Sequence, residues 1–276
     1  MELGEPFVQS APGLFLLESW IRSQRGLVAG FTSRQGGEST GPFAENNLSF
    51  QVGDAFFSVL QNRRKVAARL HFSLKNWVFA GQVHGTSLHS ASSADRGKGA
   101  EKGDTAIPGT DGLYTAQRGI MLALTFADCV PIYFFSPSCH LIGIVHAGWR
   151  GTAGRIAPRL IEKWKKLGVP ASDMRVAIGP SICGNCYLVD EAVIGQFRNG
   201  GVRTENIRPV GNGQYALDLK QINYDWIRSA GIPEENIAVS SWCTSCRTDL
   251  FYSHRRDRGK TGRMLGFIGM REDRYL

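Results

Sequence analysis

The sequence has no run of about 18 apolar residues, the minimum for a membrane-spanning helix. Its first 20 residues also lack the basic start and long apolar stretch of a signal peptide. We therefore expect a cytosolic protein with no membrane contact. In that compartment the six cysteines are expected to remain thiols or to bind metal, because the reducing cytosol disfavours structural disulfides.

The chain also lacks a nucleic-acid-binding motif, an internal repeat and any break in composition, so we expect one domain over residues 1–276. It is nonetheless basic, with 32 Lys and Arg against 24 Asp and Glu and a formal charge of +8. Most basic residues are scattered, which favours a small anionic ligand such as phosphate over nucleic acid. A basic nucleotide- or RNA-binding protein remains an alternative, supported by one cluster: His254, Arg255, Arg256, Arg258, Lys260 and Arg263.

Three short apolar runs, at residues 120–126, 130–135 and 141–145, have the composition of buried strands. With the apolar segment 78–80 they form the predicted centre of the fold. Alternating strands and helices elsewhere indicate an α/β or α+β class with a mixed sheet. The other predicted elements are strands at 14–20, 26–32, 174–178 and 237–241, helices at 55–70 (with Asp54 as N-cap), 155–167, 190–198 and 219–230, and a mobile, lid-like surface loop at 92–111.

Polar residues end the central runs: Cys129 follows the first run, His146 follows the third, and His84 follows segment 78–80. Two imidazoles and one thiolate suit a catalytic zinc, which keeps its fourth position open. The spacings, 45 positions from His84 to Cys129 and 17 from Cys129 to His146, match no local zinc motif. The same residues are also consistent with histidines that only form hydrogen bonds and a cysteine that only packs in the core. A second enzyme class is a metal-free hydrolase or amidase with Cys129 as nucleophile and His146 or His84 as base.

Several ordered motifs change this balance. They include QVHG (82–85), ADCVP (127–131) and HAGWRGT (146–152), of which HAGWRGT is the most specific. Together with nine further matches, these motifs resemble those of the YfiH-like family, also called the multicopper polyphenol oxidase or laccase-domain family. The remaining matches are DGL (111–113), NLS (47–49), GD (53–54), NR (62–63), IGPSI (178–182), CY (186–187), FYS (251–253), RR (255–256) and TGR (261–263).

The resemblance implies a YfiH-like fold and a zinc ion held by His84, Cys129 and His146. It further implies purine nucleoside phosphorolysis, in which adenosine, inosine, guanosine or methylthioadenosine reacts with phosphate to give the base and ribose 1-phosphate. Adenosine deamination is implied as a parallel activity. Leu188 departs from the family, which tends to have glutamate after the CY pair, so substrate preference is open at this position.

The laccase label itself is not expected to apply. A multicopper oxidase holds its cluster with many imidazoles, typically in His-X-His pairs, whereas this chain has six histidines and no such pair. Two histidines and one cysteine could still bind a single copper ion, since copper outcompetes zinc on affinity. We treat such copper as adventitious.

Four further residues are candidates around the ligands. Arg150 and Arg63 are predicted to grip phosphate through forked donors, and Arg150 is also a catalytic candidate. Asn47 is a candidate for binding substrate or phosphate. Asp128 is either an acceptor that orients a ligand histidine or a turn former in the Ala-Asp-Cys break, and it is grouped with Cys129 and Arg150 as catalytic.

The other cysteines include two CxxC pairs, Cys183/Cys186 and Cys243/Cys246. This spacing within each pair is typical of a four-thiolate structural zinc site. The 57 positions from Cys186 to Cys243 exceed the usual ribbon loop, so partly buried thiols near the active site are favoured. A second metal and a redox disulfide remain the alternatives.

Overall fold

The computed structural model describes residues 4–198 and 204–272 and is built around two large β-sheets. The first sheet has seven strands in the order β1 (Val8–Ala11), β2 (Leu14–Leu16), β3 (Leu27–Thr32), β16 (Met264–Met270), β8 (Ile120–Phe126), β4 (Trp77–Gly81) and β6 (Ile107–Pro108). The second has six strands in the order β15 (Ile237–Val239), β11 (Arg175–Ile178), β9 (Val130–Ser136), β10 (Leu141–Ala147), β7 (Gly112–Thr115) and β5 (Leu88–Ser90).

The two sheets pack face to face because their central strands are apolar on both sides. On β8, Leu122 and Leu124 enter the core between the sheets, whereas Met121 and Ala123 face the opposite side. On β9, Tyr133 and Phe135 enter the same inner core. Successive strand residues point to opposite faces, so a continuous apolar run predicts a strand covered on both faces.

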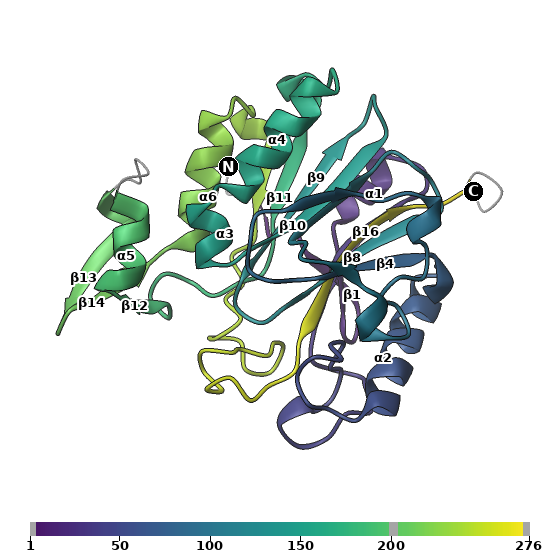
Figure 1. Ribbon diagram of the computed structural model, residues 1–276, viewed down its shortest axis with the longest axis horizontal. Helices are drawn as coiled ribbons and strands as arrows, with labels where there is room; N and C mark the ends of the chain where they lie inside the picture. Colours follow the sequence, from purple (N-terminus) through teal and green to yellow (C-terminus); the bar gives the residue numbers. More distant parts are fainter. Residues whose placement is uncertain (1–3, 199–203, 273–276) are drawn as a thin grey trace.

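Helices cover the outer faces. Helices α4 (Ile156–Lys166) and α6 (Leu219–Ser229) lie over the six-stranded sheet, and α2 (Phe56–Arg69) lies over the seven-stranded one (Figure 1). The result is a four-layer helix–sheet–sheet–helix arrangement. The shorter helices are α1 (Glu18–Ser23), α3 (Trp149–Ala153) and α5 (Glu191–Arg198).

A small third sheet extends to one side of these layers. Its strands are β12 (Leu188–Asp190), β14 (Gln214–Leu217) and β13 (Ile207–Gly211), and α5 packs beside it (Figure 1). The loop that enters β12 leaves the six-stranded sheet after β11. This connection carries the first CxxC pair.

The α+β class with mixed sheets is confirmed, as are the central strands and helices α2, α4, α5 and α6. The predicted strand 14–20 is too long, because β2 ends at Leu16 and α1 begins at Glu18. Asp54 does not cap α2: Ala55 is the N-cap, and the Asp54 carboxylate accepts from Ser39 and Asn47. No helix in the described ranges is both long and apolar enough to cross a bilayer.

Segment 92–111 differs from the expected irregular loop. It contains the 3₁₀ turns Ser93–Asp95 and Gly103–Thr105 and strand β6, and Ala100 is fully buried. The Arg63 guanidinium of α2 donates to the carbonyls of Gly99 and Ala100. These contacts hold the segment against the protein instead of leaving it free to act as a lid.

Candidate metal centre

The ligand atoms of His84, Cys129 and His146 converge, all lying within 4.8 Å of one another. His84 follows β4 of the seven-stranded sheet, and His146 lies in β10 of the six-stranded sheet. Cys129 stands in the connection from β8 to β9, where the chain crosses between the two sheets. The centre therefore lies where the two sheets meet, and not along one row of adjacent strand ends.

The backbone around the centre is shaped to bring the three ligands close. Asp128 and His84 adopt left-handed conformations, with φ of +85° and +59°. A Cβ atom on Gly148 would lie 2.9 Å from the Cys129 sulfur and 3.3 Å from His84 Cδ2. Glycine at 148 thus lets the chain after β10 pass directly beside the ligands.

The Asp111 carboxylate orients two of the three ligands of the centre, a role that the sequence analysis did not assign. Its carboxylate accepts hydrogen bonds from the backbone N–H groups of Val83, His84 and Gly85 at 3.1, 3.0 and 2.7 Å. It also lies 2.9 Å from His146 Nδ1. A carboxylate on one ring nitrogen fixes the ring so that the other nitrogen faces a metal. The DGL motif at 111–113 was the available signal, but nothing in it reveals this contact.

Electrostatic coupling favours the thiolate form of Cys129, which is the form that binds metal. Burial alone would raise the pKa of the Cys129 thiol, but the charge of His146 and hydrogen bonds to His146 and His84 lower it to about 6. Burial would likewise lower the pKa of His146, but the charge of Cys129 and the hydrogen bond to Asp111 raise it to about 9. Both shifts favour a thiolate beside an imidazolium, and a metal cation bound at this position would replace the shared proton.

The donor set fits zinc. One thiolate and two imidazoles are ligands that Zn²⁺ prefers, and three protein ligands are the number found in catalytic zinc sites. His146 is buried, Cys129 is half-buried and His84 is exposed, so a fourth ligand can approach from the His84 side. Copper is compatible with the same three atoms, and the donors alone do not separate the two ions.

Tyr187 is coupled electrostatically to Cys129 and to two arginines. Burial raises the pKa of Tyr187 to about 12, with the negative charge of Cys129 adding to it and the positive charges of Arg255 and Arg150 opposing it. The Arg150 guanidinium lies 4.3 Å from the Trp149 ring, and that of Arg255 lies 4.7 Å from the Tyr187 ring. Arg255 and Tyr187 lie in motifs that match the family, but only the fold places them beside Cys129.

Arg263 is a third cation near the centre. Burial lowers its pKa, while the charges of Cys129 and Asp128 raise it. Its Nη1 donates to the carbonyls of Thr261 and Gly262, which fixes the guanidinium in place. The predicted basic cluster at 254–263 therefore contributes to the surroundings of the metal ligands.

Two predicted phosphate-binding residues lie elsewhere. Arg63 is 4% exposed, its guanidinium lies 3.9 Å from the Phe79 ring, and its donors bind the carbonyls of Leu48, Gly99 and Ala100. Asn47 is fully buried, with its amide donating to Asp54 and accepting from the backbone of Arg263. Both side chains are occupied in holding loops together, which disfavours the predicted phosphate contacts.

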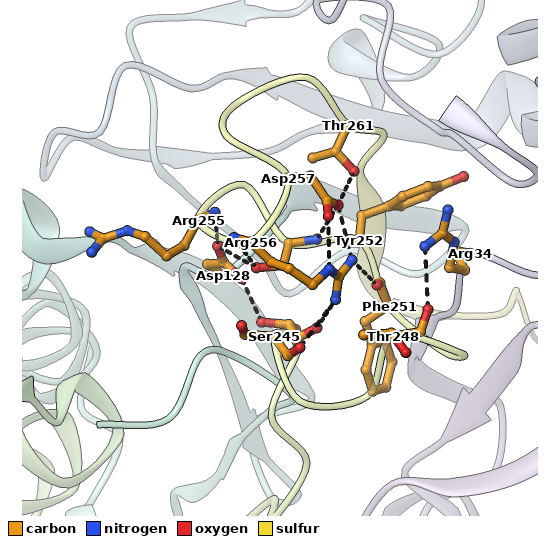
Figure 2. Close-up of polar contacts among 12 residues, drawn as sticks. Arg34, Asp128, Ser245, Thr248, Phe251, Tyr252, Arg255, Arg256, Asp257 and Thr261 are labelled. Atoms are coloured by element: carbon orange, nitrogen blue, oxygen red, sulfur yellow. Dashed lines mark hydrogen bonds and ion pairs between the residues drawn. The ribbon is translucent and has the colours of Figure 1, made fainter. Parts of the chain in front are cut away.

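Asp128 is also occupied by structural contacts. Its carboxylate accepts from the Thr244 hydroxyl at 2.7 Å, the Ser253 hydroxyl at 3.0 Å and the Arg255 backbone N–H at 2.7 Å (Figure 2). These bonds join the turn that carries Cys129 to the loop at 244–261. The ligand-orienting contact expected of Asp128 is made by Asp111 instead.

The family model described as multi-copper polyphenol oxidoreductase laccase matches residues 28–271. The chain belongs to this family. The match covers the six-stranded sheet and all three ligands of the centre. In the seven-stranded sheet it leaves out β1, β2 and the first residue of β3. The name of the family refers to copper, whereas the described residues offer the three-donor centre and a separate cluster of four cysteines.

Relatives agree with this placement. The chain is 49% identical to purine nucleoside phosphorylase YlmD of Geobacillus stearothermophilus over 95% of this chain and 99% of that protein. It is 40% identical to purine nucleoside phosphorylase YlmD of Bacillus subtilis over 99% of this chain and all of that protein. The crystal structure of Bacillus licheniformis hypothetical protein YfiH is 46% identical, covers 96% of this chain and 99% of its own, and superposes with a TM-score of 0.93.

Proposed function

We propose that this protein is a zinc-dependent purine nucleoside phosphorylase. The observation that carries the proposal is the convergence of the ligand atoms of His84, Cys129 and His146, in a chain that aligns over 95% or more of its length with relatives that carry that enzyme's name. The reaction joins phosphate to C1′ of the ribose and breaks the bond to the purine nitrogen. The products are the free base and ribose 1-phosphate.

His84, Cys129 and His146 would hold the zinc ion. When bound, zinc supplies a Lewis acid that can polarise an oxygen of phosphate or water. Asp111 keeps the His146 ring oriented, and its three bonds to residues 83–85 keep His84 in place. The protein's task is to hold the reacting groups at a constant geometry, which lowers the entropic part of the barrier.

Phosphate binding is assigned to the exposed cations beside the centre. Arg150 is exposed, and its guanidinium carbon lies 4.3 Å from the centre of the Trp149 ring. Arg255 lies over Tyr187 and donates to the carbonyl of Leu188. Guanidinium groups bind phosphate oxygens through paired donors.

The proposed substrates are adenosine, inosine, guanosine and methylthioadenosine, with adenosine deamination as a parallel activity. Leu188 begins β12 and is half-buried. Its carbonyl holds Arg255, so the backbone at 188 contributes to the site, whereas the side chain offers no polar group to a base. Preference among the four nucleosides is expected to depend on this position.

The test is product analysis of inosine and adenosine incubated with metal-quantified protein, with and without phosphate. Hypoxanthine or adenine together with ribose 1-phosphate should form only with phosphate. Inosine formed from adenosine without phosphate would add deamination. A zinc-loaded protein that yields none of these products would refute the proposal. The matched control for loss of a thiol is Cys139→Ser, which changes an exposed cysteine in the β9–β10 turn.

A metal-free cysteine hydrolase is the second candidate, favoured by the low pKa of Cys129 beside His146. It predicts amide or ester hydrolysis that survives a chelator and stops after alkylation. The phosphorylase predicts activity that stops with the chelator and returns with zinc. The two outcomes are mutually exclusive.

A further inference from the structure

The two CxxC pairs, 57 positions apart in the chain, meet in space. The sulfur atoms of Cys183, Cys186, Cys243 and Cys246 all lie within 4.8 Å of one another. The Cys186 and Cys246 sulfurs are 3.5 Å apart. Two thiolates on one tetrahedral zinc lie roughly 3.8 Å apart, given Zn–S bonds of about 2.3 Å. A disulfide requires about 2.05 Å.

Parallel strand pairing brings the two pairs together. Strands β11 and β15 are hydrogen-bonded in parallel, with Ile178 opposite Val239. The two segments that follow them therefore leave the sheet at the same end. The extensions stay paired beyond the strands: Thr244 N–H donates to the Ser181 carbonyl at 3.2 Å, and Ser181 forms an isolated parallel bridge with Cys243. Each extension then reaches its CxxC turn. The long loop between the pairs is therefore no obstacle to a shared site.

Backbone groups are oriented toward the sulfurs. The N–H groups of Cys183 and Cys246 both donate to the Cys243 sulfur, at 3.3 and 3.4 Å. The Cys186 N–H closes the first turn on the Cys183 carbonyl at 3.0 Å. N–H donors on a sulfur stabilise its thiolate form, which is the form that binds metal.

A buried cation lies beside the same cluster. Lys220 is 9% exposed and donates to the carbonyls of Ser240 and Trp242, immediately before Cys243. Burial lowers its pKa, and the strongest opposing influence is the charge of Cys243. A buried ammonium is stable only near compensating negative charge. A tetrathiolate zinc site carries two negative charges and supplies this compensation.

We propose that Cys183, Cys186, Cys243 and Cys246 bind a structural Zn²⁺ ion, with release of the thiol protons. Four thiolates fill a tetrahedral zinc and leave no open position, so this site holds structure and does not take substrate. It is distinct from the centre at His84, Cys129 and His146 and does not depend on the activity of that centre.

The site would fasten the loops that hold the Cys129 turn. Ile182, next to the first pair, donates its N–H to the Asp128 carbonyl at 3.0 Å, and Thr244, within the second pair, donates its hydroxyl to the Asp128 carboxylate. Arg256 donates to the carbonyls of Thr244 and Ser245, closing the same loop (Figure 2). A zinc ion joining the two loops would therefore maintain the position of Asp128, and Cys129 follows it directly.

The experiment is metal analysis of the full chain expressed with zinc. Wild type and Cys139→Ser should each contain two zinc equivalents per chain. The double variant H84A/H146A should retain one equivalent, and C186S/C246S should retain the other. One equivalent in wild type, unchanged in C186S/C246S, would overturn the proposal.

A spectroscopic measurement covers the case in which C186S/C246S fails to fold. H84A/H146A, which keeps all four thiols, is loaded with Co²⁺. A tetrathiolate site should give intense sulfur-to-cobalt charge-transfer bands, and the four thiols should resist alkylation until the metal is removed. Absence of these bands with free alkylation of all four thiols would overturn the proposal, as would iron as the tightly held metal of wild type.

Discussion

The two clusters of ligand residues are built from different donors and oriented by different devices. The first combines two imidazoles and one thiolate, and its exposed member, His84, faces solvent. The second has four thiols, for which we propose a structural zinc ion. Three donors leave a position for a reacting oxygen, whereas four close the coordination shell. The comparison indicates that the candidate catalytic centre and the proposed structural zinc site use separate residues. The structural site would hold the loops that support the catalytic centre.

The orienting groups differ in the same way. A buried carboxylate, Asp111, fixes the first centre through four hydrogen bonds. Backbone N–H groups and the buried Lys220 surround the second. A carboxylate strengthens imidazole ligands, and positive groups stabilise thiolates. Each environment thus matches the donors that it surrounds.

The largest expected effect separates the two clusters by activity. His146→Ala should remove metal from the first centre and lower phosphorolysis by roughly 10³-fold or more, because a metal ion supplies several kcal/mol of charge stabilisation. Initial rates with inosine, measured together with zinc content, provide the check. Full turnover without zinc at this centre would contradict the assignment, and loss of both metals would show that the clusters are not independent.

Asp111→Asn tests the orienting carboxylate. The Asn side chain has the same size as Asp, but its N–H₂ group would face backbone N–H donors that bind a carboxylate oxygen in the wild type. We expect zinc affinity at the first centre to fall about 10–100-fold, with the four-cysteine cluster unaffected. Competition with a chromophoric chelator measures the zinc affinity of the first centre and that of the four-cysteine cluster. Asp128→Asn is the comparison variant, since the Asp128 carboxylate binds Thr244, Ser253 and the Arg255 backbone and should change zinc affinity less.

Gly148→Ala tests how tightly the first centre is packed. The added methyl would lie 2.9 Å from the Cys129 sulfur, so the ligands must shift. Overpacking of this kind typically costs about 1–3 kcal/mol, which should appear as weaker zinc binding and a lower free energy of unfolding. Gly195→Ala is the matched control: its Cβ meets nothing within 4 Å, and in a helix it should be neutral or slightly stabilising. Equal effects of the two substitutions would contradict the packing argument.

Asp95→Asn, away from both clusters, gives the smallest effect and a baseline. Burial would raise the Asp95 pKa, but Lys98, the Ser92 amide and His89 lower it well below its usual range. We expect a loss of about 1–2 kcal/mol in the free energy of unfolding at pH 7, without change in zinc content or turnover.

The pH dependence of this effect has a definite sign. The folded pKa of Asp95 is depressed, so its stabilisation is present above the unfolded pKa of about 3.9 and is lost as pH falls below it. The difference between wild type and Asp95→Asn, measured by denaturant unfolding, should therefore shrink in that direction. A difference that grows toward low pH would contradict the assignment.

Local patterns predicted most of the secondary structure. Apolar runs at 120–126, 130–135 and 141–145 became β8, β9 and β10, and helical spacing placed α2 and α4 within one or two residues. The position of Cys129 after β8 followed from where the first apolar run ends, whereas His146, expected after the third run, lies inside β10. The family resemblance carried the proposed activity, since no pattern of apolar residues identifies a substrate.

The tertiary structure decided everything that depends on contacts between distant segments. Asp111 is bound to residues 83–85 and 146, Arg63 is buried against carbonyls 36 and 37 positions away, and the CxxC pairs meet through the parallel pairing of β11 with β15. Periodicity reports which face of an element is buried, but it does not report which element covers that face. For this protein, the sequence alone determined the elements and the candidate ligands, and the arrangement of the two sheets determined which polar groups surround them.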